Sequence, residues 1–135
     1  MGIPGVGKTT VVSRVVELLK EKSIRVSVSI FGTVMFDEAK KKGVQNRDDL
    51  RKLSVKQQKE LQSMAAKTIA SIDDDVIIVD THAFISTKEG FYPGLPHNVL
   101  EILNPDSFIM ITARPEEIYN RTHGQRAGIS INNQT

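Results

Sequence analysis

A segment near the start of the chain combines the residue types that hold phosphate groups. Residues 2–9 read Gly-Ile-Pro-Gly-Val-Gly-Lys-Thr, which matches the pattern G-x-x-x-x-G-K-[ST] in full. The glycines let successive backbone N–H groups curl around phosphates at the mouth of a helix. Lys8 adds a mobile positive charge, and the Thr9 hydroxyl is a ligand for Mg²⁺. A glycine-rich turn that binds nothing is the alternative, but such a turn does not need Lys8 and Thr9. The residues predicted to bind nucleotide phosphates are Gly2, Ile3, Pro4, Gly5, Val6, Gly7, Lys8, Thr9 and Thr10.

A second candidate for metal chemistry is Asp80, which follows the apolar run at 76–79. Such a run predicts a strand covered on both faces. A carboxylate at the carboxyl end of a parallel strand, opposite a phosphate loop, is the usual second anchor for Mg²⁺ and its waters. A capping aspartate is the alternative. The phosphate loop favours the metal role, so Thr9 and Asp80 are the predicted metal residues.

Helices and strands that could position these groups alternate along the chain. Val26, Val28 and Ile30 share one face of a predicted strand that stops at Gly32. A capping box of Ser54 and Gln57 predicts the start of another helix. The remaining predictions are helices at 8–22, 33–42, 97–103 and 115–121, strands at 25–31, 76–79 and 108–111, a loop at 82–96 and an irregular tail at 122–135. Alternation of this kind predicts an α/β fold with a parallel sheet between helices.

The composition is that of an ordinary globular protein and excludes several classes of function. Hydrophobic residues make up 39% of the 135 residues and charged residues 25%. There is no cysteine, so disulfides and thiolate metal sites are excluded. The net charge of +2 makes no case for nucleic acid as the main ligand. No apolar run is long enough for a membrane helix, and no secretory signal is visible. We therefore expect one domain, a cytoplasmic location and no nucleic-acid or membrane partner.

Two further blocks make the chain resemble a known family. Residues 80–83 read Asp-Thr-His-Ala and residues 90–96 read Gly-Phe-Tyr-Pro-Gly-Leu-Pro. Residues 47–53 read Arg-Asp-Asp-Leu-Arg-Lys-Leu. Together with the phosphate loop, these blocks are similar to those of the archaeal adenylate kinases. The similarity runs from about residue 2 to residue 121, and the combination is far more specific than the loop alone.

The resemblance implies reversible transfer of a phosphoryl group from ATP·Mg to AMP, giving two ADP. It implies that Lys8 and Thr9 hold the donor phosphates and metal, and that Asp80 holds metal-bound water. Arg121 would approach the donor phosphates, although it could simply complement the end of its helix. It also implies a P-loop NTPase-type sheet flanked by helices, and a homo-oligomer, specifically a trimer, as partner state.

The resemblance also assigns an AMP side, formed by helices within 33–72. Arg51 would grip the AMP phosphate, because a guanidinium forks onto phosphate oxygens. A solvated helical face is the competing interpretation for Arg51. Gly94, Leu95 and Pro96 would shape the adenine pocket. His82 could be a metal ligand, but a satisfied loop histidine is the favoured interpretation.

The sequence departs from the family in several places. Ser86 stands where similar sequences commonly have arginine, and Lys88 is the substitute we predict for the AMP phosphate. Thr33 stands where an acidic residue is common. The strand before the loop, most of the lid, and the last strand and helix are not in this sequence. We therefore expect 1–135 to form a single incomplete P-loop kinase domain, with 122–135 a lid remnant or a disordered tail. Two alternatives remain: a kinase for another nucleoside monophosphate, and a nucleotide-binding module with little catalysis.

Overall fold

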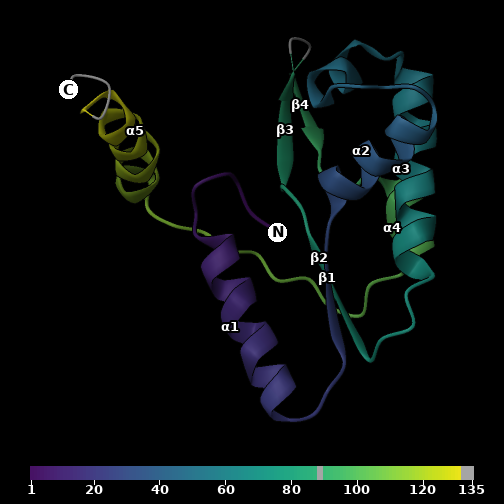
Figure 1. The fold of residues 1–135 in the computed structure, drawn as a ribbon, viewed down its shortest axis with the longest axis horizontal. Helices are drawn as coiled ribbons and strands as arrows, with labels where there is room; N and C mark the ends of the chain where they lie inside the picture. The colour runs from purple at the N-terminus through teal and green to yellow at the C-terminus, as the bar shows by residue number, and fades with distance from the viewer. Residues whose placement is uncertain (88–89, 132–135) are drawn as a thin grey trace.

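The computed structural model describes residues 1–87 and 90–131, and for 85–87 and 124–131 it describes the backbone alone. Helices and strands alternate, as predicted, and a parallel strand pair lies at the centre (Figure 1). The elements are α1 (Lys8–Glu21), β1 (Val26–Ile30), α2 (Phe31–Lys41), the 3₁₀ helix η1 (Arg47–Lys52), α3 (Val55–Ala70), β2 (Val76–Asp80), β3 (Phe84–Thr87), β4 (Gly90–Pro93), α4 (His97–Leu103) and α5 (Pro115–Ile131).

The strand pair fixes where the candidate site can form. β1 and β2 run parallel in a register that pairs Val26 with Val76 and Ile30 with Asp80. The carboxyl ends of both strands therefore meet at one edge, as in α/β folds whose ligands bind there. This edge carries Asp80 at the end of β2 and the first turn of α2 at the end of β1. The predicted α/β arrangement is confirmed.

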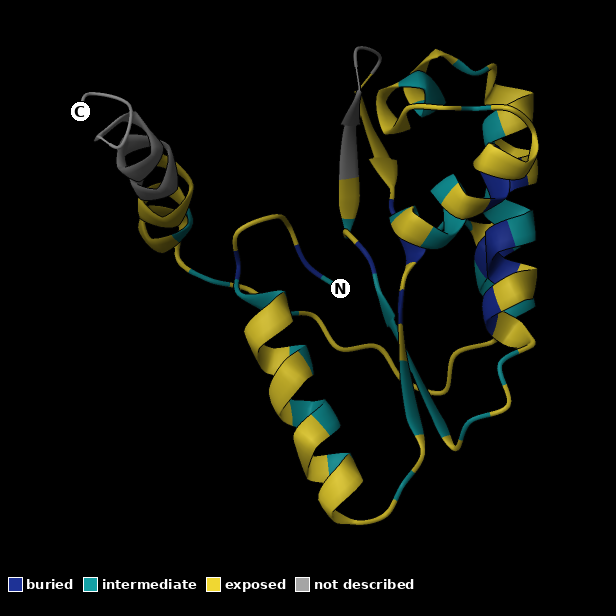
Figure 2. Cartoon of the chain, in the orientation of Figure 1, coloured by how far each residue is buried: buried dark blue, intermediate teal, exposed yellow. Residues whose placement is uncertain are grey.

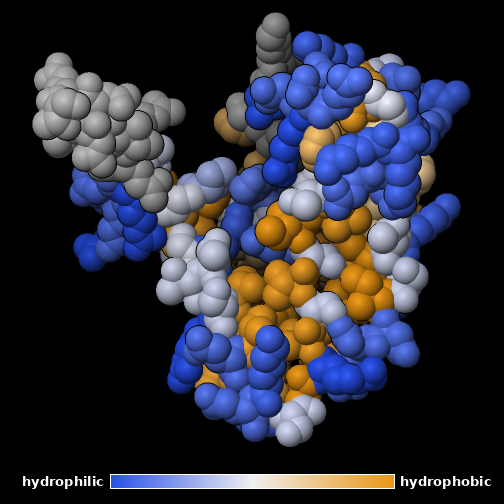
Figure 3. All heavy atoms as spheres, in the orientation of Figure 1, coloured by the Kyte–Doolittle hydropathy of each residue, from blue (hydrophilic) through white to orange (hydrophobic). Residues whose placement is uncertain are grey.

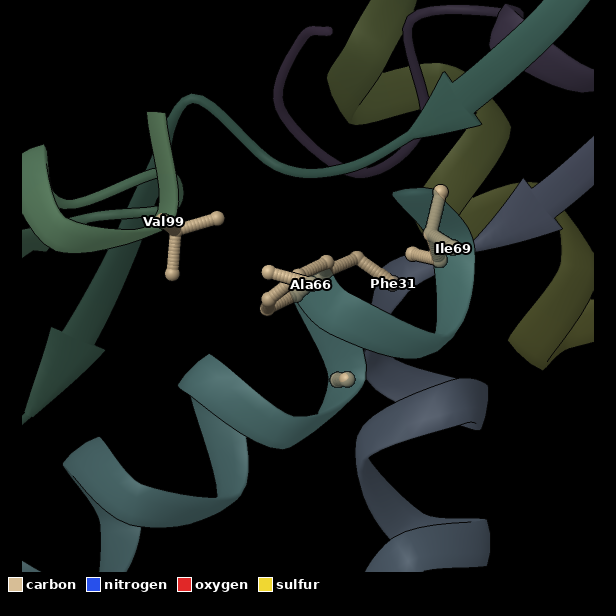
Figure 4. Close-up of a cluster of buried hydrophobic side chains, with 5 residues drawn as sticks. Phe31, Ala66, Ile69 and Val99 are labelled. Carbon is tan, nitrogen blue, oxygen red and sulfur yellow. The ribbon is translucent and has the colours of Figure 1, made fainter. Parts of the chain in front are cut away.

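The buried core lies on one side of this strand pair, among α2, α3 and α4 (Figure 2). Ala65, Ala66 and Ile69 of α3 are almost fully buried and pack with Phe31 and Val99 (Figure 4). The capping box of α3 is formed as predicted: the Gln57 N–H donates to Ser54 Oγ, and the Ser54 N–H donates to Gln57 Oε1. The capping box therefore determines where α3 begins, and its apolar face determines which side is buried.

The prediction that the apolar strands are covered on both faces was wrong. Every residue of β2 is only half-buried, and Val28 and Ile30 of β1 are 42% and 51% exposed. In the face of the molecule drawn in Figure 3, an apolar area extends over the strand pair between α1 and the α2–α3 side. The reason is that α1, although all its residues are described, buries none of them against the sheet.

The first two residues anchor the phosphate loop through backbone hydrogen bonds on two sides. The Met1 ammonium donates to the Ile109 carbonyl at 2.7 Å, and the Ile111 N–H donates to the Met1 carbonyl at 2.8 Å. On the other side Gly2 forms a parallel bridge with His82. Gly2 is required there, because a Cβ would lie 2.6 Å from the Ile111 carbonyl oxygen.

The predicted strand at 108–111 was wrong. This segment forms no strand among the described residues, and Phe108, Ile109 and Met110 are more than half exposed. It hydrogen-bonds to Met1 alone among the backbone partners recorded for it. Pairing with one residue is too short to form a strand. The apolar side chains of this segment are therefore not covered by a neighbouring strand.

Other boundaries also differ from the predictions. The predicted loop at 82–96 contains an antiparallel hairpin, in which β3 and β4 pair Phe84 with Pro93 and Thr87 with Gly90. Gly32 lies inside α2, which begins at Phe31 directly after β1, and so does not stop the strand as predicted. The helix predicted to end at Arg121 continues as α5 to Ile131, into the segment expected to be irregular. Residues 132–135 lie outside the described part.

Candidate phosphate and nucleotide site

The phosphate loop has the backbone geometry that anion binding needs. Gly5 and Gly7 have φ values of 85° and 95°, a region that favours glycine. Gly7 is the N-cap of α1, and within this described stretch no side chain caps the helix and no acidic residue lies in its first turn. The N–H groups and positive end of α1 therefore face the loop, where phosphate oxygens would satisfy them.

Lys8 lies at the centre of the site and is held by several acceptors. Its Nζ atom is 3.2 Å from the Gly2 carbonyl oxygen and 2.9 Å from His82 Nδ1. It is also 3.9 Å from Asp80 Oδ1, and the Lys8 and Asp80 side chains are 10% and 17% exposed. The loop and the end of β2 are therefore in direct electrostatic contact, as expected if Asp80 at the end of its strand faces the phosphate loop.

His82 interacts with Lys8, which the sequence interpretation as a satisfied loop histidine did not anticipate. A lysine ammonium has no acceptor, so Lys8 donates and the Nδ1 lone pair accepts. Burial and, next, the Lys8 charge lower the pKa of His82, which favours the neutral ring that can accept this hydrogen bond. A histidine two positions after a strand-ending aspartate was the signal available in the sequence.

A cavity of about 650 Å³ opens above the loop and extends toward α2 and α3. Loop residues, Asp80 and Arg121 line it on the phosphate side. The other lining residues are Ile30, Phe31, Gly32, Met35, Arg47, Gln62, Thr81, His82, Gly94 and Thr122. The cavity thus combines charged groups, suited to phosphates, with apolar side chains and a few polar groups, as small-molecule sites generally do.

Arg121 approaches the loop from α5. Its guanidinium donates to the Gly5 carbonyl at 3.2 Å and lies 3.2 Å from where a Gly7 Cβ would be. Thr122 and Ile118 of the same helix lie against Gly5. Helix α5 therefore places a cation beside the phosphate-binding backbone.

Of the residues predicted to bind AMP, only Gly94 is among the described residues that line the cavity. Gly94 lines the cavity, whereas Leu95 packs against the core, and neither it nor Pro96 is among the described lining residues. Arg51 is exposed on η1, and among the described residues it is Arg47 of this block that lines the cavity. Lys88 lies outside the described residues, so its predicted role has no structural counterpart here.

Gly32 explains why Arg47 reaches the cavity. A Cβ at Gly32 would lie 2.7 Å from an Arg47 guanidinium nitrogen, so the missing side chain makes room for this arginine. The sequence reasoning missed Arg47, Gln62, Phe31 and Met35. Arg47 stands in the same block as Arg51, but the 3₁₀ helix that places Arg47 rather than Arg51 at the cavity is not visible in the sequence.

The residues present fit a magnesium ion that is held mainly by its nucleotide. Thr9, whose side chain carries a hydroxyl, and Asp80, which carries a carboxylate, both line the cavity. In the described part of the chain there is no group of three or more histidine or acidic side chains that could hold a metal by themselves. A site of one hydroxyl and one carboxylate suits Mg²⁺, which keeps waters and takes phosphate oxygens as further ligands.

None of the helices among the described residues is long and apolar enough to span a bilayer.

Sequence comparison gives results consistent with this geometry. The chain is 47% identical over 123 residues to an adenylate kinase of Methanocaldococcus jannaschii, covering 90% of this chain and 64% of that protein. It is 46% identical over 125 residues to an adenylate kinase of Sulfurisphaera tokodaii, covering 89% and 64%. With an adenylate kinase of Methanococcus aeolicus it shares 40% over 122 residues, covering 89% and 63%. The chain thus spans slightly less than two thirds of the length of these curated relatives. A family model described as AAA domain matches residues 1–133, and this chain therefore belongs to that family.

Proposed function

We propose that this protein is an ATP:AMP phosphotransferase, which reversibly converts ATP and AMP into two ADP. The observation that carries the proposal is one cavity with a phosphate loop at one end and Arg47, Gln62 and the apolar start of α2 at the other. A cavity built in this way can bring the γ-phosphate of a donor next to the phosphate of an acceptor. The similarity to archaeal adenylate kinases supports AMP as the acceptor.

On the donor side, the loop backbone and Lys8 bind the phosphates of ATP. Lys8 leaves His82 and Gly2 and places its charge on the group that is transferred. Thr9 and Asp80 would hold Mg²⁺, which when bound neutralises charge on the donor phosphates. Arg121 moves from the Gly5 carbonyl onto the phosphate oxygens, because a guanidinium binds them more strongly than a neutral carbonyl.

On the acceptor side, we assign the first grip on the AMP phosphate to Arg47, because Arg47 lines the cavity. Arg51 and Lys88, the candidates from the sequence, remain proposals for outer contacts with the same phosphate. The Gly94-Leu95-Pro96 segment and the apolar side chains of α2 would surround the adenine. Gly94 lines the cavity and has no side chain to fill it.

No general base is needed for this reaction. Phosphoryl transfer depends mainly on alignment of the two substrates and on charge neutralisation at the transferred group. The cations that line the cavity, Lys8, Arg47 and Arg121, supply that neutralisation from three different elements. Their convergence on one cavity is what we expect of a phosphotransferase.

The test is a phosphoryl-transfer assay with Mg·ATP and a panel of acceptors, followed by ³¹P NMR. We expect ADP to form with AMP and to form at least about tenfold more slowly with CMP, UMP or GMP, as a difference of about 1.4 kcal/mol would give. Faster transfer to another monophosphate would move the assignment to a different kinase. ATP binding without transfer to any acceptor would make the protein a nucleotide-binding module.

The homotrimer, the cytoplasmic location and the absence of nucleic-acid and membrane partners remain predictions. Sedimentation of the purified protein would test the trimer directly.

A further inference from the structure

We infer that His82 is a positioning residue that holds the Lys8 ammonium apart from the Asp80 carboxylate. By doing so, His82 keeps Lys8 available for phosphate and Asp80 available for metal when the site is empty. The inference rests on the proposed function only in taking Lys8 as the phosphate ligand of the loop.

The His82 backbone is fixed tightly enough for such a role. On one side it forms the parallel bridge with Gly2, and the next residue, Ala83, donates its N–H to the Gly2 carbonyl at 3.2 Å. On the other side lies Gly94, where a Cβ would be only 1.6 Å from the His82 carbonyl oxygen. Close backbone approach on both sides therefore limits how far residue 82 can move.

The positions around Lys8 show what the imidazole prevents. Lys8 Nζ is 2.9 Å from His82 Nδ1 but 3.9 Å from Asp80 Oδ1, which is beyond hydrogen-bond distance. Both charged side chains are largely screened from water. Without the histidine acceptor, the ammonium can close the gap of about one ångström and form a direct hydrogen-bonded ion pair with Asp80.

A closed Lys8–Asp80 pair would compete with the ligand. An ion pair in a partly buried site is stronger than one at the surface, and a phosphate would have to break it before using Lys8. His82 also lines the cavity, but its replacement by alanine should weaken phosphate binding chiefly because Lys8 is then released to Asp80.

The experiment measures binding of inorganic tripolyphosphate to the full chain by calorimetry in the presence of EDTA. This probe needs Lys8 and the loop but no acceptor site and no metal. We expect His82→Ala to weaken binding about tenfold, the equivalent of 1.4 kcal/mol. His82→Asn, whose side-chain oxygen can replace Nδ1 as acceptor, should stay within about threefold of the wild type.

A double variant separates positioning from a structural role. In an Asp80→Asn background there is no carboxylate for Lys8 to pair with, so adding His82→Ala should change binding by less than about twofold. His97→Ala is the matched control, since His97 is exposed on α4 next to Glu101. It should leave binding unchanged, and thermal unfolding of every variant reports whether the fold is retained.

The outcomes distinguish the inference from the proposed function. If the wild-type chain binds tripolyphosphate, three results would overturn the inference alone. They are an unchanged affinity in His82→Ala, the same loss of affinity in His82→Asn as in His82→Ala, and a loss from His82→Ala that persists in the Asp80→Asn background. A wild-type chain that does not bind tripolyphosphate would overturn the inference together with the phosphate-site assignment.

Discussion

Helices α2, α3 and α4 pack around an apolar core, whereas α1, on the other side of the strand pair, has no buried residue along its described length. Ile69 and Val99 are at most 1% exposed, but Val11 and Leu18 of α1 are 42% and 41% exposed. The α2–α3 side of the cavity therefore rests on a tightly packed core. The phosphate side depends instead on glycine geometry and on backbone hydrogen bonds from Met1 and Gly2.

This difference separates stability from phosphate binding. Residues of the core contribute mainly to the free energy of unfolding, because their burial removes apolar surface from water. We expect residues of the loop to contribute mainly to ligand affinity, because phosphate oxygens would be the partners of their polar groups. Substitutions on the two sides should therefore affect different measurements.

The largest expected effect is on stability, from Ile69→Ala. Loss of this buried side chain should lower the free energy of unfolding by about 2–5 kcal/mol, through lost burial and the cavity left behind. Val11→Ala in α1 should cost less than about 1 kcal/mol. Urea unfolding followed by circular dichroism measures both values, and equal losses would show that α1 is packed as tightly as α3.

The next largest effect is on the reaction, from Lys8→Met. Removal of this charge should slow phosphoryl transfer about 100- to 1000-fold, as loss of one electrostatic contact to the reacting group typically does. The midpoint of urea unfolding should hardly change, since Lys8 is not part of the core. Lys20→Met, at the far end of α1, is the control and should retain full activity. A similar loss in both variants would contradict a specific role for Lys8.

The arginines of η1 sharpen the account of the acceptor side. Arg47→Ala should weaken AMP binding about 10- to 100-fold, because hydrogen bonds to a charged group contribute about 1.5–3 kcal/mol. Arg51→Ala should weaken it less, because Arg47 lines the cavity and Arg51 is not among its described lining residues. Calorimetric titration with AMP ranks the two. The opposite ranking would return the phosphate grip to Arg51.

The smallest effect concerns Glu38, which is buried between α2 and α3. Hydrogen bonds from Lys41 and Thr68 lower the pKa of Glu38. A lowered folded-state pKa adds stability above the unfolded value of about 4.3, and that stability disappears as the pH falls through the folded value. Glu38→Gln should therefore cost about 1 kcal/mol at pH 7 and less at pH 3, as urea unfolding at both values would show. A cost that does not depend on pH would contradict this role of the charge.

The sequence predicted elements whose signals are local. The capping box of Ser54 and Gln57, the helix after Gly7 and the apolar β2 run each follow from neighbouring residues, and each is present. The positions of the phosphate loop and Asp80 were predictable because the G-x-x-x-x-G-K-[ST] pattern and an aspartate directly after an apolar run are both local in the sequence. The burial of β1 and β2 was not predictable, because it depends on how closely α1 packs against them.

The acceptor side shows why other site residues could not be predicted. Arg47 and Arg51 stand in one block and have the same chemistry, and the backbone of η1 decides which one lines the cavity. His82 was treated as a loop residue, because its contact with Lys8 joins positions 74 residues apart. The hairpin of β3 and β4 was missed because Gly90, Pro93 and Gly94 indicate a loop.

The central claim is that one cavity holds the donor phosphates at the loop and the acceptor on the α2–α3 side. Backbone amide chemical shifts measured by NMR test it residue by residue. Tripolyphosphate should shift the amides of Gly5, Gly7 and Lys8, whereas AMP added without ATP should shift those of Gly32, Met35 and Gln62. AMP shifts confined to the phosphate loop, or no AMP shifts at all, would contradict the account.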